Sequence, residues 1–278
     1  MNMPVSMNFF DKQPVLYPWP WLLRQSGLKL TYKPREVWWK GWIGKLGLEK
    51  GQKLLDVGCG RGIFLDRLTA EFGIKAFGID IAKEVIGEAK KKSAFKLDLR
   101  VADACSLPFS DGFFDVVISL DTLEHIRGKQ ARAVSEMVRV LKKGGKMLIY
   151  TINKNQSLTW NWLLDKLGID VYQNVGHDPK LFIDPDWLTK ELGGRGVKVL
   201  ALDYFNSFFT LAVDELIMVL LSFWKRFFGW EKTEKFGKIG LRTLTFLARV
   251  LTPILRVFDL PWTIFGHSNG FLVLGEKR

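Results

Sequence analysis

A strand-like apolar run that meets closely spaced glycines is the feature that most constrains this chain. The run KLLDV occupies residues 53–57, glycines follow at positions 58, 60 and 62, and helical spacing continues over 63–72. A strand, a glycine turn and a helix place backbone N–H groups and the positive end of a helix beside a ligand. The dinucleotide fingerprint Gly-x-Gly-x-x-Gly does not fit, because Ile63 holds its sixth position, and the Gly-Lys-Ser/Thr of a P-loop is absent.

Strand-like and helix-like patterns then alternate in the order that gives a parallel sheet. Strands are expected over 75–79, 97–101, 115–119, 146–151, 197–204 and 270–277, and helices over 83–92, 129–141, 159–167 and 185–192. KKGG at 142–145 is expected to end the helix before it, and Asp184 and Pro185 suit the N-cap and first position of the last helix. The fold expected is α/β, a Rossmann-like doubly wound seven-stranded sheet with a helical insertion before the last strand.

Three acidic residues follow or end consecutive strands of this pattern. Asp56 lies two residues before Gly58, where it would repel a pyrophosphate but suit an ammonium group. Asp80 ends the second strand, where a carboxylate can accept both hydroxyls of a ribose. Asp103 follows the third strand and is placed to meet an adenine amino group. Unless these acids merely cap the strand ends, they describe a nucleoside joined to a cationic amino acid, which is S-adenosylmethionine.

Four segments over residues 53–151 resemble, in order, the motifs of class I S-adenosylmethionine-dependent methyltransferases: LLDVGCGRG, GID, VADACSLPFSDGFFDVVIS and LKKGGKMLIYT. The resemblance implies that Gly58 and Gly60 approach the methionine part of the cofactor and that Leu120 lies beside it. The cofactor-binding set that it implies is Asp56, Gly58, Cys59, Gly60, Asp80, Ile81, Asp103, Ala104 and Leu120.

The segment SLDTLEHI, residues 119–126, offers groups for the acceptor side of such a site. Asp121, Glu124 and His125 stand at i, i+3 and i+4, so one helical turn could direct all three at a common point. Two carboxylates and an imidazole can bind a divalent cation, or His125 alone could be a general base. Either would remove the proton of a phenol before methylation.

A narrower resemblance covers DTLEHI, TINKNQSLTW and VGHDPKLFIDPDWLTKEL, and it ends at about Tyr204. These segments are similar to ubiquinone-biosynthesis O-methyltransferases, which methylate polyprenylated catechols at the membrane and include metal-dependent members. Glu124 and His125 match them directly, Asp121 replaces the usual Glu as first metal ligand, and His177 matches a histidine of a Gly-Thr-His segment. Three alternatives stay open: a metal at Asp121, Glu124 and His125; His125 or His177 as catalytic base; and a purely structural pair. His267 is expected to be structural.

Charge and aromatic residues point to a surface as partner. The formal net charge is +12, and residues 19–53 interleave eight Lys or Arg with five Trp against two Glu. This pattern suits a membrane interface, although a solvated helix pair packed by its aromatics would share it. Residues 208–224 are apolar but contain Asp214 and Glu215, which favours a helix in the interface over a spanning one. Lys235, Arg242, Arg249 and Arg256 recur every seven residues, as on one side of a helix that lies on lipid or forms a lid.

Four regions are therefore expected: a basic and aromatic helical region at 1–52, a catalytic domain at 53–206, an amphipathic insertion at 207–266 and the final strand at 267–278. Two cysteines are too few for a disulfide framework, so a reducing cytoplasm is expected, and the N-terminus lacks the features of a secretory signal and is expected to be retained.

The sequence as a whole predicts a cytoplasmic, peripherally membrane-associated methyltransferase for a hydrophobic acceptor of the lipid or quinone-precursor type, with O-methylation as the favoured reaction. Methylation of RNA or protein is the alternative that the charge leaves open, and a non-enzymatic membrane adaptor with the same fold is another. Nucleic acid is disfavoured because no appended RNA-binding module is evident. An oxidoreductase is disfavoured by Asp56 and the glycine spacing.

Overall fold

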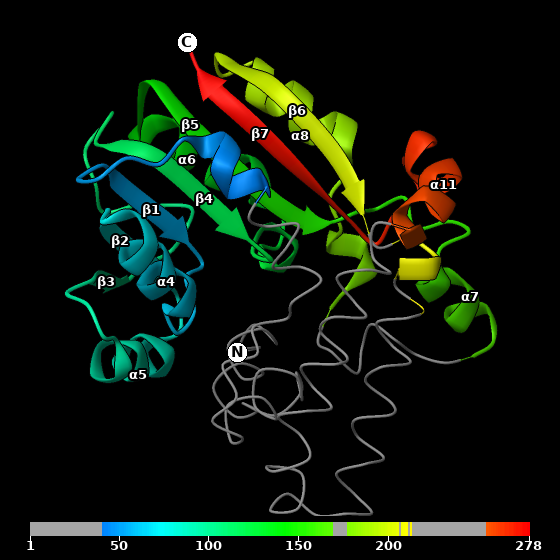
Figure 1. The fold of residues 1–278 in the computed structure, drawn as a ribbon, viewed down its shortest axis with the longest axis horizontal. Helices are drawn as coiled ribbons and strands as arrows, with labels where there is room; N and C mark the ends of the chain where they lie inside the picture. The colour runs from blue at the N-terminus through cyan, green and yellow to red at the C-terminus, as the bar shows by residue number, and fades with distance from the viewer. Residues whose placement is uncertain (1–40, 169–176, 206, 211, 213–253) are drawn as a thin grey trace, which may run out of the picture.

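The computed structural model describes residues 41–168, 177–205, 207–210, 212 and 254–278. Its centre is a seven-stranded sheet with the strand order β3-β2-β1-β4-β5-β7-β6 (Figure 1). The strands are β1 (Lys53–Val57), β2 (Lys75–Asp80), β3 (Asp98–Val101), β4 (Phe114–Leu120), β5 (Leu141–Ile152), β6 (Val197–Phe205) and β7 (Gly270–Lys277). All neighbours from β3 to β5 are parallel, whereas β7 runs antiparallel to both β5 and β6. The seven expected strands are therefore present in a mixed sheet.

Helices cover both faces of the sheet and connect its strands. They are α4 (Ile63–Phe72), α5 (Lys83–Lys92), α6 (Gln130–Val140), α7 (Trp160–Lys166), α8 (Pro185–Gly193), α11 (Leu260–Ile264) and the 3₁₀ helices η1 (Leu123–His125) and η3 (Pro179–Leu181). The cap predicted for α8 is confirmed, because the Asp184 carboxylate accepts from the N–H groups of Asp186 and Trp187. No helix among the described residues is both long and apolar enough to cross a membrane.

The KKGG segment differs from the expectation. It lies within β5 instead of forming a separate turn, and α6 ends at Val140. Phe114 pairs with Leu141 and Val116 with Lys146, so residues 142–145 bulge out of the ladder between two pairs of the same strands. Gly144 adopts a φ of +72°, which a glycine tolerates without strain.

Two apolar clusters lie on opposite faces of the sheet, as a doubly wound fold requires. Leu55 contributes to the cluster beneath α6 and α8, and its neighbour Leu54 contributes to the cluster beneath α4 and α5. Trp42 belongs to the second cluster and is only 5% exposed. This tryptophan therefore packs in the core, contrary to an interfacial role; the other four tryptophans of residues 19–53 lie outside the described residues, as do most of the expected 1–52 region and the 207–266 insertion.

Candidate active site

The glycine turn between β1 and α4 is held against the end of β2. The N–H groups of Gly58 and Cys59 donate to the Ile79 carbonyl at 2.8 and 2.9 Å, and the Gly60 N–H donates to Asp80 Oδ2 at 2.9 Å. Gly58 has a φ of +84°, and a Cβ there would lie 2.1 Å from Thr122 Oγ1. A Cβ at Gly60 would meet nothing within 4 Å. The turn is therefore fixed on its inner side and open at Gly60, where a ligand can approach the backbone.

Gly78 supports this turn from below, a role that the sequence analysis missed. A Cβ on Gly78 would lie 2.7 Å from Cys59 Sγ and 2.8 Å from Leu65 Cδ1. Cys59 is buried, and burial raises the pKa of its thiol, so this side chain packs as a small apolar group. Only a residue without a side chain lets the glycine turn lie this close to β2.

Asp56 is the most unusual acid at this edge. It is 3% exposed, and its Oδ1 atom has no hydrogen-bond partner. Burial, together with the nearby charge of Asp80, raises the pKa of Asp56 to about 7. A buried carboxyl with an unpartnered oxygen is costly, and a cationic ligand would relieve that cost.

The remaining cofactor-side residues lie at the neighbouring strand ends. Asp80 Oδ1 accepts from the Ala82 N–H at 2.9 Å, and because each carboxylate oxygen accepts more than one bond, both retain capacity for ribose hydroxyls. Ile81, beside it, is 54% exposed. Asp103 is exposed and its Oδ1 accepts from the Cys105 N–H, while Ala104 is buried and Leu120 is half-buried at the end of β4.

These features fit S-adenosylmethionine. The unpartnered Asp56 oxygen suits an ammonium group, the open backbone at Gly60 suits close approach, and exposed Ile81 offers apolar surface next to the acid expected at the ribose. The residues would hold the cofactor along the carboxyl ends of β1, β2 and β3, the edge at which ligands bind in open α/β sheets.

On the acceptor side, the SLDTLEHI segment does not form the α-helical turn that its spacing suggested. It contains only the 3₁₀ helix η1, and Asp121 precedes that helix with a φ of +52°. Asp121 is exposed, whereas Glu124 is 1% exposed. The chain direction changes between them, so the two carboxylates do not project from one helical face.

Glu124 is buried against β5. Its Oε2 atom accepts from Thr151 Oγ1 at 2.8 Å, and its Oε1 atom has no hydrogen-bond partner. Burial, with the charge of Asp121, raises the pKa of Glu124 to about 8. Both effects disfavour the ionised form of this carboxyl.

His125 and His177 stack on each other at this point. Their ring centroids are 5.0 Å apart with an interplanar angle of 24°, and Phe182 packs against His177 at 6.3 Å. A parallel bridge between Asn153 and Ile183 extends the end of β5 and brings the segment that begins at His177 alongside it. Burial lowers the pKa of His125 to about 4, so its imidazole is neutral at physiological pH.

The group that could hold a metal differs from the one expected. Glu124, His125 and His177 each offer a ligand atom, and these atoms lie within 4.8 Å of one another. Among the described residues Asp121 does not belong to this group, because η1 is a 3₁₀ helix and Asp121 lies before it with left-handed backbone. Two imidazoles and a carboxylate are a donor set that divalent transition metals accept.

His267 lies in the loop before β7. Its N–H donates to the Trp262 carbonyl at 2.8 Å, and its own carbonyl accepts from Ser207 Oγ. These backbone contacts connect α11 with the start of the insertion. The structural role expected of its imidazole stays a prediction.

A partly buried ion-pair network fixes the loop that carries Asp103, and the sequence analysis missed it. Arg139 donates to both oxygens of Glu136 at 2.8 and 2.9 Å, and also to the carbonyls of Leu107 and Phe109. The Leu107 N–H donates in turn to Glu136. The network therefore connects α6 to the segment that follows β3.

The comparisons with known proteins fit this arrangement. The family described as "Methyltransferase domain" matches residues 55–149, which span β1 to β5. Residues 55–149 are therefore similar to this methyltransferase domain family. The resemblance that its motifs suggested is thereby confirmed, as is S-adenosylmethionine as the cofactor of this domain family.

Relatives of this methyltransferase domain act on different acceptors. The chloroplastic tocopherol O-methyltransferase of Arabidopsis thaliana is 41% identical over 108 residues, which are 37% of this chain and 31% of that one. A ubiquinone biosynthesis O-methyltransferase of Coxiella burnetii is 29% identical over 54% of this chain and 65% of its own. The matches thus span less than two thirds of these relatives.

A solved structure extends the likeness in fold. Phosphoethanolamine N-methyltransferase 2 of Haemonchus contortus, in complex with S-adenosyl-L-methionine, has a TM-score of 0.60 at 19% identity. The alignment covers 98% of this chain and 59% of that one. The fold class predicted for the methyltransferase domain is therefore confirmed.

Proposed function

We propose that this protein is an S-adenosylmethionine-dependent methyltransferase that methylates an oxygen atom of a hydrophobic, membrane-associated small molecule of the lipid or quinone-precursor type. The observation that carries the proposal is the continuous edge that runs from Asp56 and Asp80 to the stacked pair His125 and His177. One part suits a cationic nucleoside, and the other suits removal of a proton.

The cofactor-side residues bind and orient. Asp56 would face the ammonium group, Asp80 the ribose hydroxyls, and Asp103 with Ala104 the adenine. When bound, S-adenosylmethionine supplies an electrophilic methyl group that already carries its leaving group. The remaining task of the protein is alignment of the acceptor oxygen, which can account for a large part of the rate.

His125 would take the proton of the acceptor hydroxyl. Its imidazole is neutral because burial lowers its pKa to about 4, so a ring nitrogen can accept a hydrogen bond. A weak base suffices when the proton leaves as the new C–O bond forms, because the hydroxyl becomes more acidic as its oxygen is alkylated. His177 stacks on the ring and holds its orientation.

A divalent cation is the alternative means of removing this proton. Glu124, His125 and His177 would hold it, and it would supply positive charge that lowers the pKa of the acceptor hydroxyl. A chelator distinguishes a histidine base from a metal site, since only the metal-dependent enzyme loses activity when the ion is removed.

The hydrophobic acceptor is supported by the relatives and by the composition. Two relatives are a tocopherol O-methyltransferase and a ubiquinone biosynthesis O-methyltransferase. The formal charge of +12 and the apolar sequence at 208–224 suit an enzyme that works at an anionic bilayer, which also supports a cytoplasmic, peripherally membrane-bound location.

The test is incubation of purified protein with methyl-deuterated S-adenosylmethionine and the membrane lipid extract of the source cells, followed by mass spectrometry. We expect a lipid or quinone precursor to gain the deuterated methyl group, with His125→Gln as the low-activity control. Parallel samples contain EDTA or cellular RNA. Label in RNA alone, or no label although the cofactor binds, would contradict the proposed acceptor class.

A further inference from the structure

The segment from residue 254 to residue 265 buries an acidic residue and exposes large apolar side chains. Both of its charged residues contact other parts of the protein: the exposed Arg256 pairs with Asp203 of β6 at 3.1 Å, and the buried Asp259 is 2% exposed. The Asp259 carboxylate accepts from the N–H groups of residues 208, 209 and 210 and from the Thr210 hydroxyl. The charges of this segment thus serve internal contacts.

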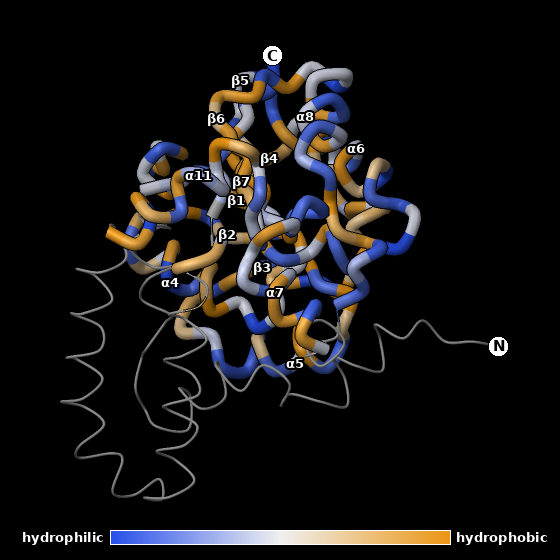
Figure 2. The backbone as a smooth tube through the Cα atoms, turned by 90° about the vertical axis from the view of Figure 1, so that its right-hand side faces the viewer, coloured by the Kyte–Doolittle hydropathy of each residue, from blue (hydrophilic) through white to orange (hydrophobic). Residues whose placement is uncertain are grey.

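The large apolar side chains of the same segment face the solvent instead. Six of them are 49–73% exposed and form what we call the α11 apolar surface: Ile254, Val257, Phe258, Leu260, Ile264 and Phe265. They account for six of the fourteen exposed large apolar residues of the described chain. Figure 2 colours part of the tube beside α11 orange, the colour of hydrophobic residues. Several large apolar side chains exposed within twelve residues indicate a site of interaction.

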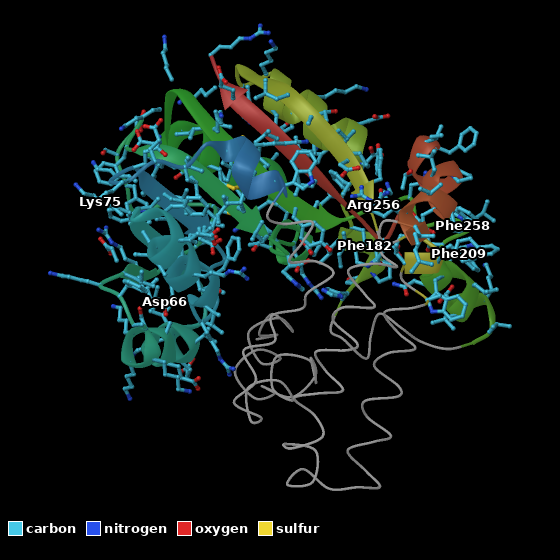
Figure 3. All side chains as sticks on the ribbon, viewed as in Figure 1. Asp66, Lys75, Phe182, Phe209, Arg256 and Phe258 are labelled. Carbon is cyan, nitrogen blue, oxygen red and sulfur yellow. The ribbon has the colours of Figure 1, made fainter. Side chains whose placement is uncertain are left out.

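An aromatic cluster beneath this surface gives it a rigid base. Trp262 stacks on Phe208 at 5.5 Å and meets Phe209 edge-on at 5.8 Å, and Phe209 also packs against Phe258 at 5.9 Å. The Trp262 indole N–H donates to the Leu158 carbonyl next to α7. Phe209 and Phe258 lie together beside α11 in Figure 3. The surface is therefore anchored to the methyltransferase domain.

The position of the surface relates it to the active site. α11 lies between the end of β6 at Phe205 and the start of β7 at Gly270. Because β6 runs parallel to β5 while β7 runs antiparallel to both, these two points lie at the carboxyl edge of β5. The glycine turn and the His125–His177 pair follow the carboxyl ends of β1 and β4, and thus share this edge (Figure 1).

We propose that the α11 apolar surface inserts into the interface of an anionic lipid bilayer and sets the acceptor side of the active site against the membrane. Charge complementarity favours a bilayer over a protein partner: the chain carries +12, and the adjoining sequence 213–253 has seven Lys or Arg against four Asp or Glu. Phenylalanine and isoleucine enter the acyl boundary, and basic residues meet phosphate groups. This inference rests on the proposed function for the identity of the acceptor but not for the contact itself.

The first experiment places a polarity-sensitive fluorophore on this surface. The fluorophore is attached to the variant Ile264→Cys, because Ile264 is 67% exposed in the parent chain. Labelling is selective, since the native Cys59 and Cys105 are buried. Phe95→Cys, 41% exposed before β3, is the control at the opposite edge. With phosphatidylcholine–phosphatidylglycerol vesicles we expect a blue shift and quenching by brominated acyl chains at position 264 alone. Absence of both effects at position 264 would overturn the proposal.

The second experiment measures partitioning. The double variant Ile264→Glu with Phe265→Glu should bind these vesicles at least tenfold more weakly, while Phe95→Glu binds like the parent, and pure phosphatidylcholine should bind the parent more weakly than the anionic mixture. Unchanged partitioning of the double variant would refute the bilayer as the partner of this surface. The same conclusion would follow if the parent bound no vesicles and light scattering showed a dimer that the double variant lacks.

Cofactor affinity and methyl transfer are measured on the same samples in detergent. Vesicle binding without turnover would refute the proposed function alone, and turnover without vesicle binding would refute this inference alone.

Discussion

At the scale of single residues, Asp56 predicts a pH dependence of cofactor binding. Its pKa is raised to about 7 in the cofactor-free protein, and a cationic ligand binds the ionised form. Below pH 7 Asp56 must lose its proton before the cation binds. The dissociation constant for S-adenosylmethionine should therefore increase as the pH falls, by up to about tenfold for each pH unit. Calorimetry between pH 5.5 and 8.5 checks this, and Asp56→Asn should abolish the dependence.

Asp56 also makes the stability of the cofactor-free protein depend on pH: ionisation of Asp56 favours cofactor binding but disfavours folding. A carboxyl whose pKa is higher in the folded protein than in the unfolded chain costs stability as the pH rises from about 4 through 7. Asp56→Asn should therefore raise the free energy of unfolding of the cofactor-free protein at pH 8 and change it little at pH 4. A loss of stability at pH 8 would show that Asp56 is satisfied by a partner.

Glu124 distinguishes the two ways of removing the acceptor proton. Burial raises its pKa and favours the uncharged form, which Gln mimics closely in shape and charge. With His125 as the base, His125→Gln should lower turnover by roughly a hundredfold or more, while Glu124→Gln retains most of it. A large loss in Glu124→Gln, together with inhibition by EDTA and lower zinc affinity, would identify a metal site instead.

Gly58 and Gly87 form a matched pair. A Cβ at Gly58 would lie 2.1 Å from Thr122 Oγ1 on backbone with a φ of +84°, whereas one at Gly87, inside α5, meets nothing within 4 Å. Gly58→Ala should cost at least about 2 kcal/mol through strain and overpacking. Gly87→Ala should instead stabilise by about 1 kcal/mol. Denaturant unfolding measures both, and equal effects would contradict the geometry of the turn.

At the scale of elements, the pair Glu136 and Arg139 connects α6 to the loop that carries Asp103. Glu136→Gln removes charge-assisted hydrogen bonds to Arg139 and to the Leu107 N–H, while Arg139 keeps its pair with Asp111, so the protein should lose about 1 to 2 kcal/mol of stability. Glu88→Gln, on the surface pair with Arg61, should change stability by about 0.5 kcal/mol or less.

The stability difference between the parent protein and Glu136→Gln should decrease at low pH. Arg139 lowers the pKa of Glu136 below its ordinary 4.5, so the contribution of Glu136 is present above pH 4.5 and is lost as the pH falls through the lower folded value. The gap between parent and Glu136→Gln should narrow below pH 4 in denaturant unfolding. A constant gap would mean that the network acts through shape alone.

The elements also show what the sequence could and could not predict. The glycine turn and the acids at strand ends were predictable because both depend on residues adjacent in the chain. The position of Asp121 was not, because a spacing of three and four residues suggests an α-helix while the backbone turns into the 3₁₀ helix η1. The Glu136–Arg139 network joins segments about thirty residues apart, and no local pattern reveals which loop an arginine will reach.

At the scale of the whole molecule, the sequence predicted the seven strands and the doubly wound arrangement of the sheet. Buried strands and amphipathic helices could be predicted because they leave periodic patterns in the sequence. Trp42 shows the limit of the composition argument. Its basic surroundings suggested an interface, yet it fills a core position beside α4 and α5. Charge and aromatic content give no direction to a side chain, whereas the packing of neighbouring elements does.

The place of β7 has a consequence for synthesis of the chain. Residues 270–277 enter the sheet between β5 and β6, both of which precede them, and β7 is almost wholly buried. Until the ribosome has passed this segment, β5 and β6 each present an unpaired edge, and the sheet cannot close around its core. In a nascent chain paused within the insertion, strands β1 to β5 could already pair as in the native sheet. The edges of β5 and β6 would stay exposed to chaperones and to association with other chains.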